Sequence, residues 1–128
     1  MNLKSLFLVF TTLLSLSLAL VLNPKITSPT AESKWRAGDQ RTITWDTENV
    51  VGGPIPADYT GVIKLGYLDP KDSPNEHLYW ELASGFPLNK GSQSVTLPQD
   101  LETRRTYIIV LMGNSGNASP EFTITAAR

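Results

Sequence analysis

Short stretches in which apolar and polar residues alternate, separated by turn-forming residues, make up most of the chain. No stretch shows a sustained helical period. Alternation of this kind predicts strands that bury one face. The seven predicted strands are residues 21–28, 41–46, 62–67, 78–82, 94–97, 106–112 and 121–125. We therefore expect an all-β fold, an antiparallel β-sandwich of immunoglobulin or fibronectin type III style.

The same alternation predicts which large side chains form the core. Ile43 and Trp45 fall on one face of their strand, and Trp80 falls on the inward face of another. The run 106–112 is nearly continuously apolar, as is typical of a central strand covered on both faces. Tyr107 opens that strand. We expect it either to pack in the core or to form a tyrosine corner.

The first residues are predicted to be an export signal. Lys4 precedes the uncharged run 6–20, which has small residues near its end. We expect residues 1–19 to be a signal peptide cleaved after Ala19. Residues 20–128 then form a single domain that is secreted to the extracellular space or the cell wall. The alternatives are a membrane anchor or a buried helix, but the run is short for a span and no positive flank follows it.

Composition excludes several kinds of chemistry. The chain has no cysteine, so disulfides, thiolate metal sites and cysteine catalysis are all excluded. Its single histidine, His77, lies beside Glu76 in a polar segment and has no second imidazole to share a metal with. We therefore expect a surface histidine, no metal and no cofactor. The net charge of −1 argues against a nucleic-acid partner.

Paired carboxylates remain as a catalytic option. A glycosidase needs two carboxyl groups about 5–10 Å apart across a cleft, one of them with a raised pKa. A sandwich of this size leaves little room for such a cleft. Nearly all Asp and Glu residues fall in predicted loops or on outward strand faces. We expect a protein that is not an enzyme, with weak glycan hydrolysis as an alternative.

Aromatic rings outside the predicted core are the best candidates for ligand binding. Flat rings can stack on sugar rings while neighbouring carboxylates bind the hydroxyl groups. Tyr79 and Glu81 alternate outward beside Trp80, whereas Trp35 and Tyr59 fall in predicted loops. Trp35, Tyr59, Tyr79 and Glu81 are therefore the predicted glycan-binding residues. For Trp35 the alternative is a cap on one end of the sandwich.

One acceptor sequence for N-glycosylation is present, Asn117-Ala118-Ser119. Pro120 follows it directly, which lowers its use. Asn117 is thus a potential acceptor rather than an expected one.

Four motifs carry a family resemblance: Ile26-Thr27-Ser28-Pro29, Trp35-Arg36-Ala37-Gly38, Thr42-Ile43-Thr44-Trp45 and Ser119-Pro120-Glu121-Phe122-Thr123-Ile124. With them the chain resembles the fungal Ser/Thr-rich GPI-anchored membrane protein family. That family shares its domain with the N-terminal part of yeast cell-wall synthesis proteins of the killer-toxin-resistance type, which are associated with β-1,6-glucan assembly. Members often continue into a Ser/Thr-rich stalk and a GPI signal, which this sequence lacks. The resemblance implies a free, secreted relative and transfers no functional residue.

Together these features predict a secreted, non-enzymatic cell-wall protein, either structural or β-glucan-associating. The expected partners are cell-wall polysaccharide or a cell-wall protein, with no membrane contact after signal cleavage. Outward Thr42, Thr44, Thr123 and Thr125 offer polar ladders for such binding; the alternative is the ordinary preference of threonine for strands. The alternative is a protein-interaction or adhesion module, or a small secreted effector that pairs through an edge strand. The sequence leaves the oligomeric state open.

Overall fold

The computed structural model describes residues 22–50, 52–69, 71, 76–113 and 116–128, except for the side chains of Glu76, His77 and Tyr79. The predicted signal peptide lies outside this part. The elements are β1 (Ile26–Ser28), β2 (Lys34–Arg36), β3 (Gln40–Trp45), β4 (Thr60–Leu68), β5 (Glu76–Pro87), a 3-10 turn (Leu88–Lys90), β6 (Ser92–Thr96), β7 (Arg104–Met112), β8 (Gly116–Ala118) and β9 (Phe122–Thr125). The fold is therefore all-β over the described residues. Among them, no helix is long and apolar enough to cross a membrane.

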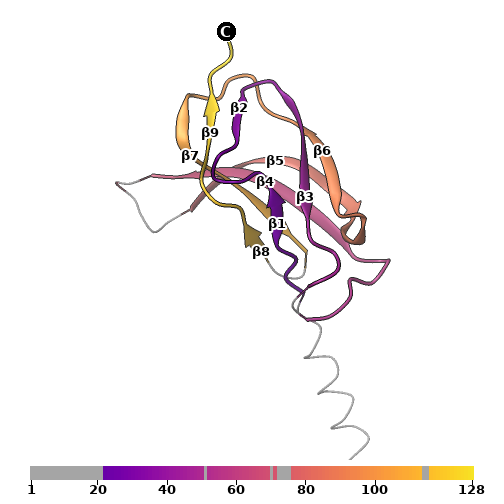
Figure 1. Ribbon diagram of the computed structural model, residues 1–128. Coiled ribbons are helices and arrows are strands. Elements are labelled where there is room, and N and C mark those ends of the chain that lie inside the picture. Colours follow the sequence, from indigo (N-terminus) through magenta and orange to yellow (C-terminus); the bar gives the residue numbers. More distant parts are fainter. Residues whose placement is uncertain (1–21, 51, 70, 72–75, 114–115) are drawn as a thin grey trace, which may run out of the picture.

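The strands form two sheets (Figure 1). One has three strands in the order β1-β3-β6, and the other has the order β2-β9-β7-β4-β5, with β8 also paired to β7. All of these pairings are antiparallel except that of β2 with β9, which is parallel. In Figure 1 the three-stranded sheet lies in front of β4, β5 and β7, and the sheets curl around the space between them.

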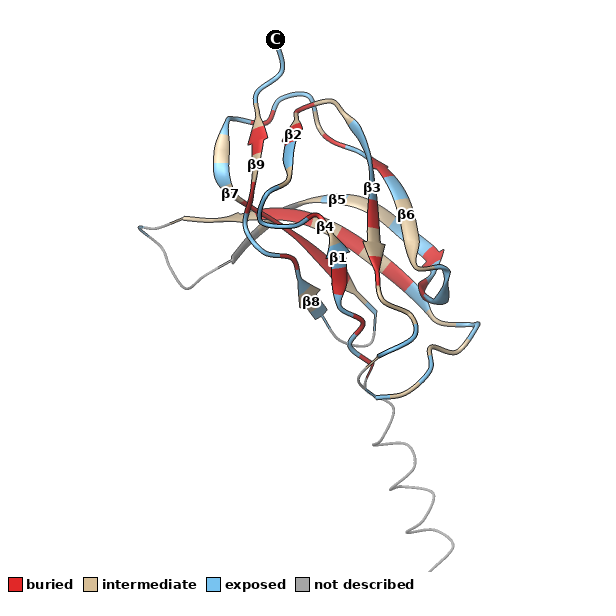
Figure 2. Ribbon diagram, viewed as in Figure 1, coloured by how far each residue is buried: buried red, intermediate tan, exposed pale blue. Residues whose placement is uncertain are grey.

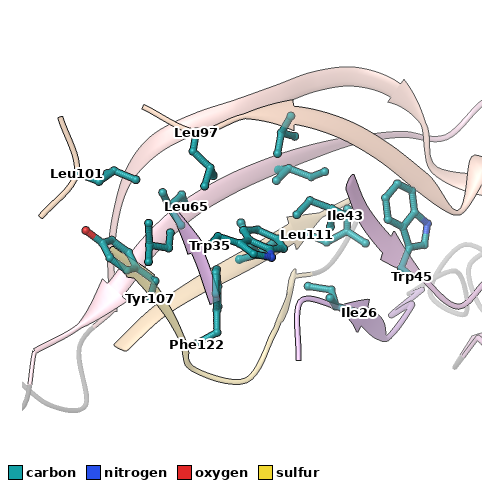
Figure 3. Packing of buried hydrophobic residues seen from close by; sticks show 14 of the residues in the cluster. Ile26, Trp35, Ile43, Trp45, Leu65, Leu97, Leu101, Tyr107, Leu111 and Phe122 are labelled. Carbon is teal, nitrogen blue, oxygen red and sulfur yellow. The ribbon is translucent and has the colours of Figure 1, made fainter. Parts of the chain in front are cut away.

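A single cluster of buried side chains fills that space, drawn from both sheets. Buried residues recur along the strands of both sheets (Figure 2). Ile43, Ile63 and Ile124 are completely buried, and burying an aliphatic side chain of this size contributes about 1.5–3 kcal/mol. The indole of Trp35 sits within the cluster (Figure 3), with its ring centroid 4.9 Å from that of Phe122 in an edge-to-face contact. The predicted core position of Trp45 is confirmed, since it is 4% exposed.

The predicted strands are present, but some bounds differ. Within the described residues 22–28, only Ile26–Ser28 form one of these strands. The predicted strand 78–82 is part of the much longer β5. The sequence pattern did not indicate β2 and β8, which have three residues each, too few to display a period. Trp35 was expected in a loop. That expectation is wrong, because β2 pairs with β9 and places Trp35 opposite Ile124.

The central position predicted for β7 is confirmed. β7 lies between β4 on one side and β8 and β9 on the other. Its residues Tyr107 to Leu111 are all buried, although successive side chains of a strand point to opposite faces. The continuous apolar run thus reflects burial of both faces of this strand.

Core packing and a tyrosine corner were alternative expectations for Tyr107, and this residue does both. Its ring is 1% exposed, and its hydroxyl donates a 2.6 Å hydrogen bond to the backbone carbonyl of Glu102, five residues upstream. Burial raises the pKa of the Tyr107 phenol. This bond ties the segment before β7 to the strand itself.

Replacing Tyr107 by Phe removes this hydrogen bond and keeps the ring. We expect the free energy of unfolding to fall by about 1 kcal/mol, the net value of one hydrogen bond. Urea unfolding measures the loss. Tyr59→Phe is the matched control, because no described residue forms a hydrogen bond with the Tyr59 hydroxyl. An equal loss in both variants would contradict the role of the corner.

Candidate functional site

A hollow of about 270 Å3 opens between the ends of β4 and β5 and the segment that leads into β7. We call it the aromatic hollow. It is lined by Tyr67, Trp80, Asp100, Leu101, Glu102, Arg104 and Tyr107. Three rings, an arginine and two carboxylates therefore converge on one small concave surface.

Strand register brings the three rings together. Tyr67 on β4 lies opposite Tyr107 on β7, and Trp80 on β5 lies opposite Leu65 of β4. The ring centroids of Tyr67, Trp80 and Tyr107 are separated by 6.2 to 6.5 Å, with the rings inclined to one another. Tyr107 is buried, whereas Tyr67 and Trp80 are half-buried. The buried ring of Tyr107 thus forms the floor of the hollow, and the other two rings retain accessible surface.

Arg104 is the polar centre of the hollow. Its guanidinium carbon lies 3.9 Å from the centroid of the Tyr67 ring, and its Nη2 is 3.2 Å from Oε2 of Glu102. Solvent-exposed ion pairs contribute little by themselves, and the Glu102 side chain is 79% exposed. Stacking on the Tyr67 ring therefore helps to hold the Arg104 guanidinium in its orientation. Donors of Arg104 and acceptors of Asp100 and Glu102 then line the same rim.

A second, wider opening of about 730 Å3 lies between β1 and the residues that follow β8. We call it the seam groove. It is lined by Lys25, Ile26, Thr27, Pro29, Thr30, Asp46, Asn117, Ala118, Ser119 and Pro120. The side-chain amide of Asn117 donates a hydrogen bond to the backbone carbonyl of Pro24. Oγ of Ser119 accepts from the amide of Ile109 at 3.0 Å and donates to the carbonyl of Pro120 at 2.9 Å. Both polar residues of the glycosylation sequence thus make hydrogen bonds within the fold.

Asp46, at the edge of this groove, stabilises the turn after β3. Its Oδ1 accepts hydrogen bonds from the amides of Glu48 at 2.8 Å and Asn49 at 3.1 Å. These bonds favour the ionised form and hold the pKa of the Asp46 carboxyl below its usual value of 3.8.

The four predicted glycan-binding residues do not form one surface among the described residues. Trp35 is 7% exposed, so its prediction is wrong: a ring enclosed by the core has no free face. Tyr59 is half-buried against the core. Glu81 is exposed and lies opposite Lys64, but it does not line the aromatic hollow. The side chain of Tyr79 lies outside the described residues.

The alternation pattern gave no sign of the residues that do line the aromatic hollow. Trp80 was predicted on the inward face of its strand, but Trp80 and Tyr67 are both only half-buried. Tyr67 lies near the end of β4, and Trp80 lies on β5, the edge strand of its sheet, so the core encloses neither ring. Glu102 and Arg104 precede Tyr107 closely. A tyrosine corner at Tyr107 is the signal that could have placed them beside its ring.

Comparisons with known proteins bear on the fold alone. No protein-family model matches the chain, and no curated protein is significantly similar to it. A solved structure, a 1.4 Å crystal structure of an uncharacterized protein from Bacillus anthracis str. Ames, is similar with a TM-score of 0.52 and 18% sequence identity. The match covers 80% of this chain and 85% of that chain. A likeness at this identity supports a shared fold.

The lowered pKa of Asp46 predicts a pH-dependent contribution to stability. A carboxyl whose pKa is depressed on folding stabilises the fold above its unfolded-state pKa, and this contribution is lost as the pH falls through the folded-state pKa. We expect the wild type to be more stable than Asp46→Ala near neutral pH. The difference should shrink as the pH falls below about 4.

Urea midpoints measured for both proteins from neutral to acidic pH test this. Asp58→Ala is the control, because Asp58 is exposed and accepts no hydrogen bond from the described residues. A difference between wild type and Asp46→Ala that stays constant across the acidic range would refute the assignment.

Proposed function

We propose that the protein is a non-catalytic carbohydrate-binding module that takes a neutral sugar in the aromatic hollow. The observation that carries this proposal is the half-buried pair Tyr67 and Trp80 beside Arg104, Asp100 and Glu102. The first ligand class to consider is β-glucan of a cell wall, since the sequence resembles a fungal cell-wall family.

The chemistry of the hollow suits a neutral, hydroxylated ring. The C–H faces of a sugar are apolar and fit an aromatic ring, whereas its hydroxyl groups are both donors and acceptors. Arg104 provides donors, and the carboxylates of Asp100 and Glu102 provide acceptors. Two negative charges and one positive charge at the rim disfavour an anionic sugar. A volume of about 270 Å3, just below the range of about 300–1,000 Å3 for ligand pockets, suits a short stretch of a chain.

The environment of the carboxylates favours a binding role over a role in hydrolysis. A glycosidase acid needs a raised pKa. Burial in apolar surroundings is what raises the pKa of such an acid. Glu102 in the hollow is largely solvated and paired with Arg104. This arrangement suits orientation of a ligand better than proton transfer.

We also propose that the two sheets are an immunoglobulin-like sandwich. What supports this is the strand order, with β1-β3-β6 facing β9-β7-β4-β5, and the tyrosine corner at the β7 residue Tyr107. The motifs of the family resemblance fall largely on β1, β2, β3 and β9. They therefore favour a shared fold, while the proposed ligand contacts come from other strands. A secreted location at the cell wall follows as part of this proposal.

Removing the Trp80 ring tests the proposed function. We expect Trp80→Ala to weaken binding of soluble β-glucan oligosaccharides at least tenfold, about 1.4 kcal/mol, in isothermal titration calorimetry. Trp80→Phe should keep most of the affinity, because it retains a flat ring. The thermal midpoint of each variant must be measured, since Trp80 also packs against the core.

Glu81→Gln is the matched control, because Glu81 neighbours Trp80 in β5 but lies outside the aromatic hollow. Its affinity should equal that of the wild type. A folded Trp80→Ala variant with unchanged affinity would remove the hollow from the binding site. Failure of the wild type to bind any neutral oligosaccharide would refute the proposed function itself.

A further inference from the structure

The outer face of the three-stranded sheet is made only of uncharged polar side chains. In β3, Ile43 and Trp45 point into the core, so their alternating neighbours point outward. The same holds around Val95 in β6 and Ile26 in β1. The seven outward residues are Thr27, Gln40, Thr42, Thr44, Ser92, Ser94 and Thr96, and we call this set the hydroxyl face.

Strand pairing arranges these side chains in rows. Gln40 lies opposite Thr96, Thr42 opposite Ser94, and Thr44 opposite Ser92. Hydrogen bonds join the rows, with 2.7 Å between the hydroxyls of Thr27 and Thr44 and 3.1 Å from Nε2 of Gln40 to Oγ of Ser94.

The sheet fixes the spacing of these groups. Neighbouring strands lie about 4.8 Å apart, and outward residues recur about every 6.7 Å along each strand. The hydroxyl face is thus a two-dimensional array of donors and acceptors rather than a set of isolated polar groups.

The composition of this face is unusual for a solvated sheet. A soluble surface is commonly designed with about 25–35% charged residues of both signs, and exposed edge strands are commonly protected by lysine. Both β1 and β6 are edge strands of this sheet, yet no outward position on it is charged or large and apolar. Such a face is suited to a neutral partner that is itself rich in hydroxyl groups.

The dimensions of the face argue against a protein partner. With three outward residues on β3, three on β6 and one on β1, the face spans only about 10 by 14 Å. A stable protein interface buries about 800 Å2 on each partner, several times this area, and has an apolar centre. An extended polymer surface presents the same hydroxyl pattern many times. A small array therefore has many equivalent sites to bind on such a surface.

We propose that the hydroxyl face is a second binding surface, which contacts the exposed hydroxyl groups of an insoluble neutral polysaccharide. The inference rests on the proposed carbohydrate-binding function but uses none of the residues of the aromatic hollow. The hollow holds a single chain, whereas the hydroxyl face contacts the side of an assembled polymer. Soluble oligosaccharides therefore report on the hollow alone, whereas retention on solid polymer also reports on the hydroxyl face.

Thr42→Lys places a long charged side chain at the centre of the array. We expect it to reduce retention on particulate β-glucan and microcrystalline cellulose at least fivefold in a depletion assay. Its affinity for soluble oligosaccharides should not change. Thr42→Ser keeps the hydroxyl and should be retained like the wild type. Thr60→Lys is the charge-matched control, because Thr60 is exposed on β4, in the other sheet.

The outcomes are separable. Unchanged retention of Thr42→Lys on both solids would overturn the hydroxyl-face proposal and leave the hollow unaffected. Equal losses for Thr42→Lys and Thr60→Lys would also overturn it, since the effect would then come from net charge. If sedimentation velocity shows a wild-type dimer that Thr42→Lys dissociates, the face binds a second copy of the chain and the polysaccharide assignment is wrong. A wild type that binds oligosaccharides but neither solid refutes the second surface only.

Discussion

Contact between two sheets across one apolar core is the interaction on which the other features depend. The chain has no cysteine, so no disulfide cross-links the sheets. Trp45 shows how the contact is made: its ring packs against Phe86 at a centroid distance of 5.6 Å, and its indole nitrogen donates a 2.7 Å hydrogen bond to the buried carbonyl of Leu88. A single residue of β3 thereby buries apolar area and also satisfies a backbone group of the turn after β5.

The sequence predicted those parts of the fold in which apolar and polar residues alternate along a strand. Alternation predicted the inward positions of Ile43 and Trp45. A continuous apolar run, without alternation, predicted that the strand around Ile109 is buried on both faces. Short strands paired with distant partners could not be found in this way. Trp35 shows the reason, because its strand exists through pairing with β9, and no local pattern records that contact.

The candidate site was less predictable than the fold. Alternation separates inward from outward residues, but Tyr67 and Trp80 fall between these classes because they lie where the core ends. A half-buried ring is the kind that can both anchor to the fold and meet a ligand. The sites proposed here also differ in kind: the aromatic hollow combines rings with charges, whereas the hydroxyl face has neither.

The parallel pairing of β2 with β9 has a consequence for how the chain acquires its structure. The hydroxyl of Thr125 donates to the carbonyl of Trp35 across a separation of 90 residues. Closing so long a loop costs chain entropy before any contact repays it, and proteins dominated by distant pairings fold slowly, over about milliseconds to seconds. During synthesis, Trp35 therefore remains without its partner strand until β9, the last of the described strands, has left the ribosome.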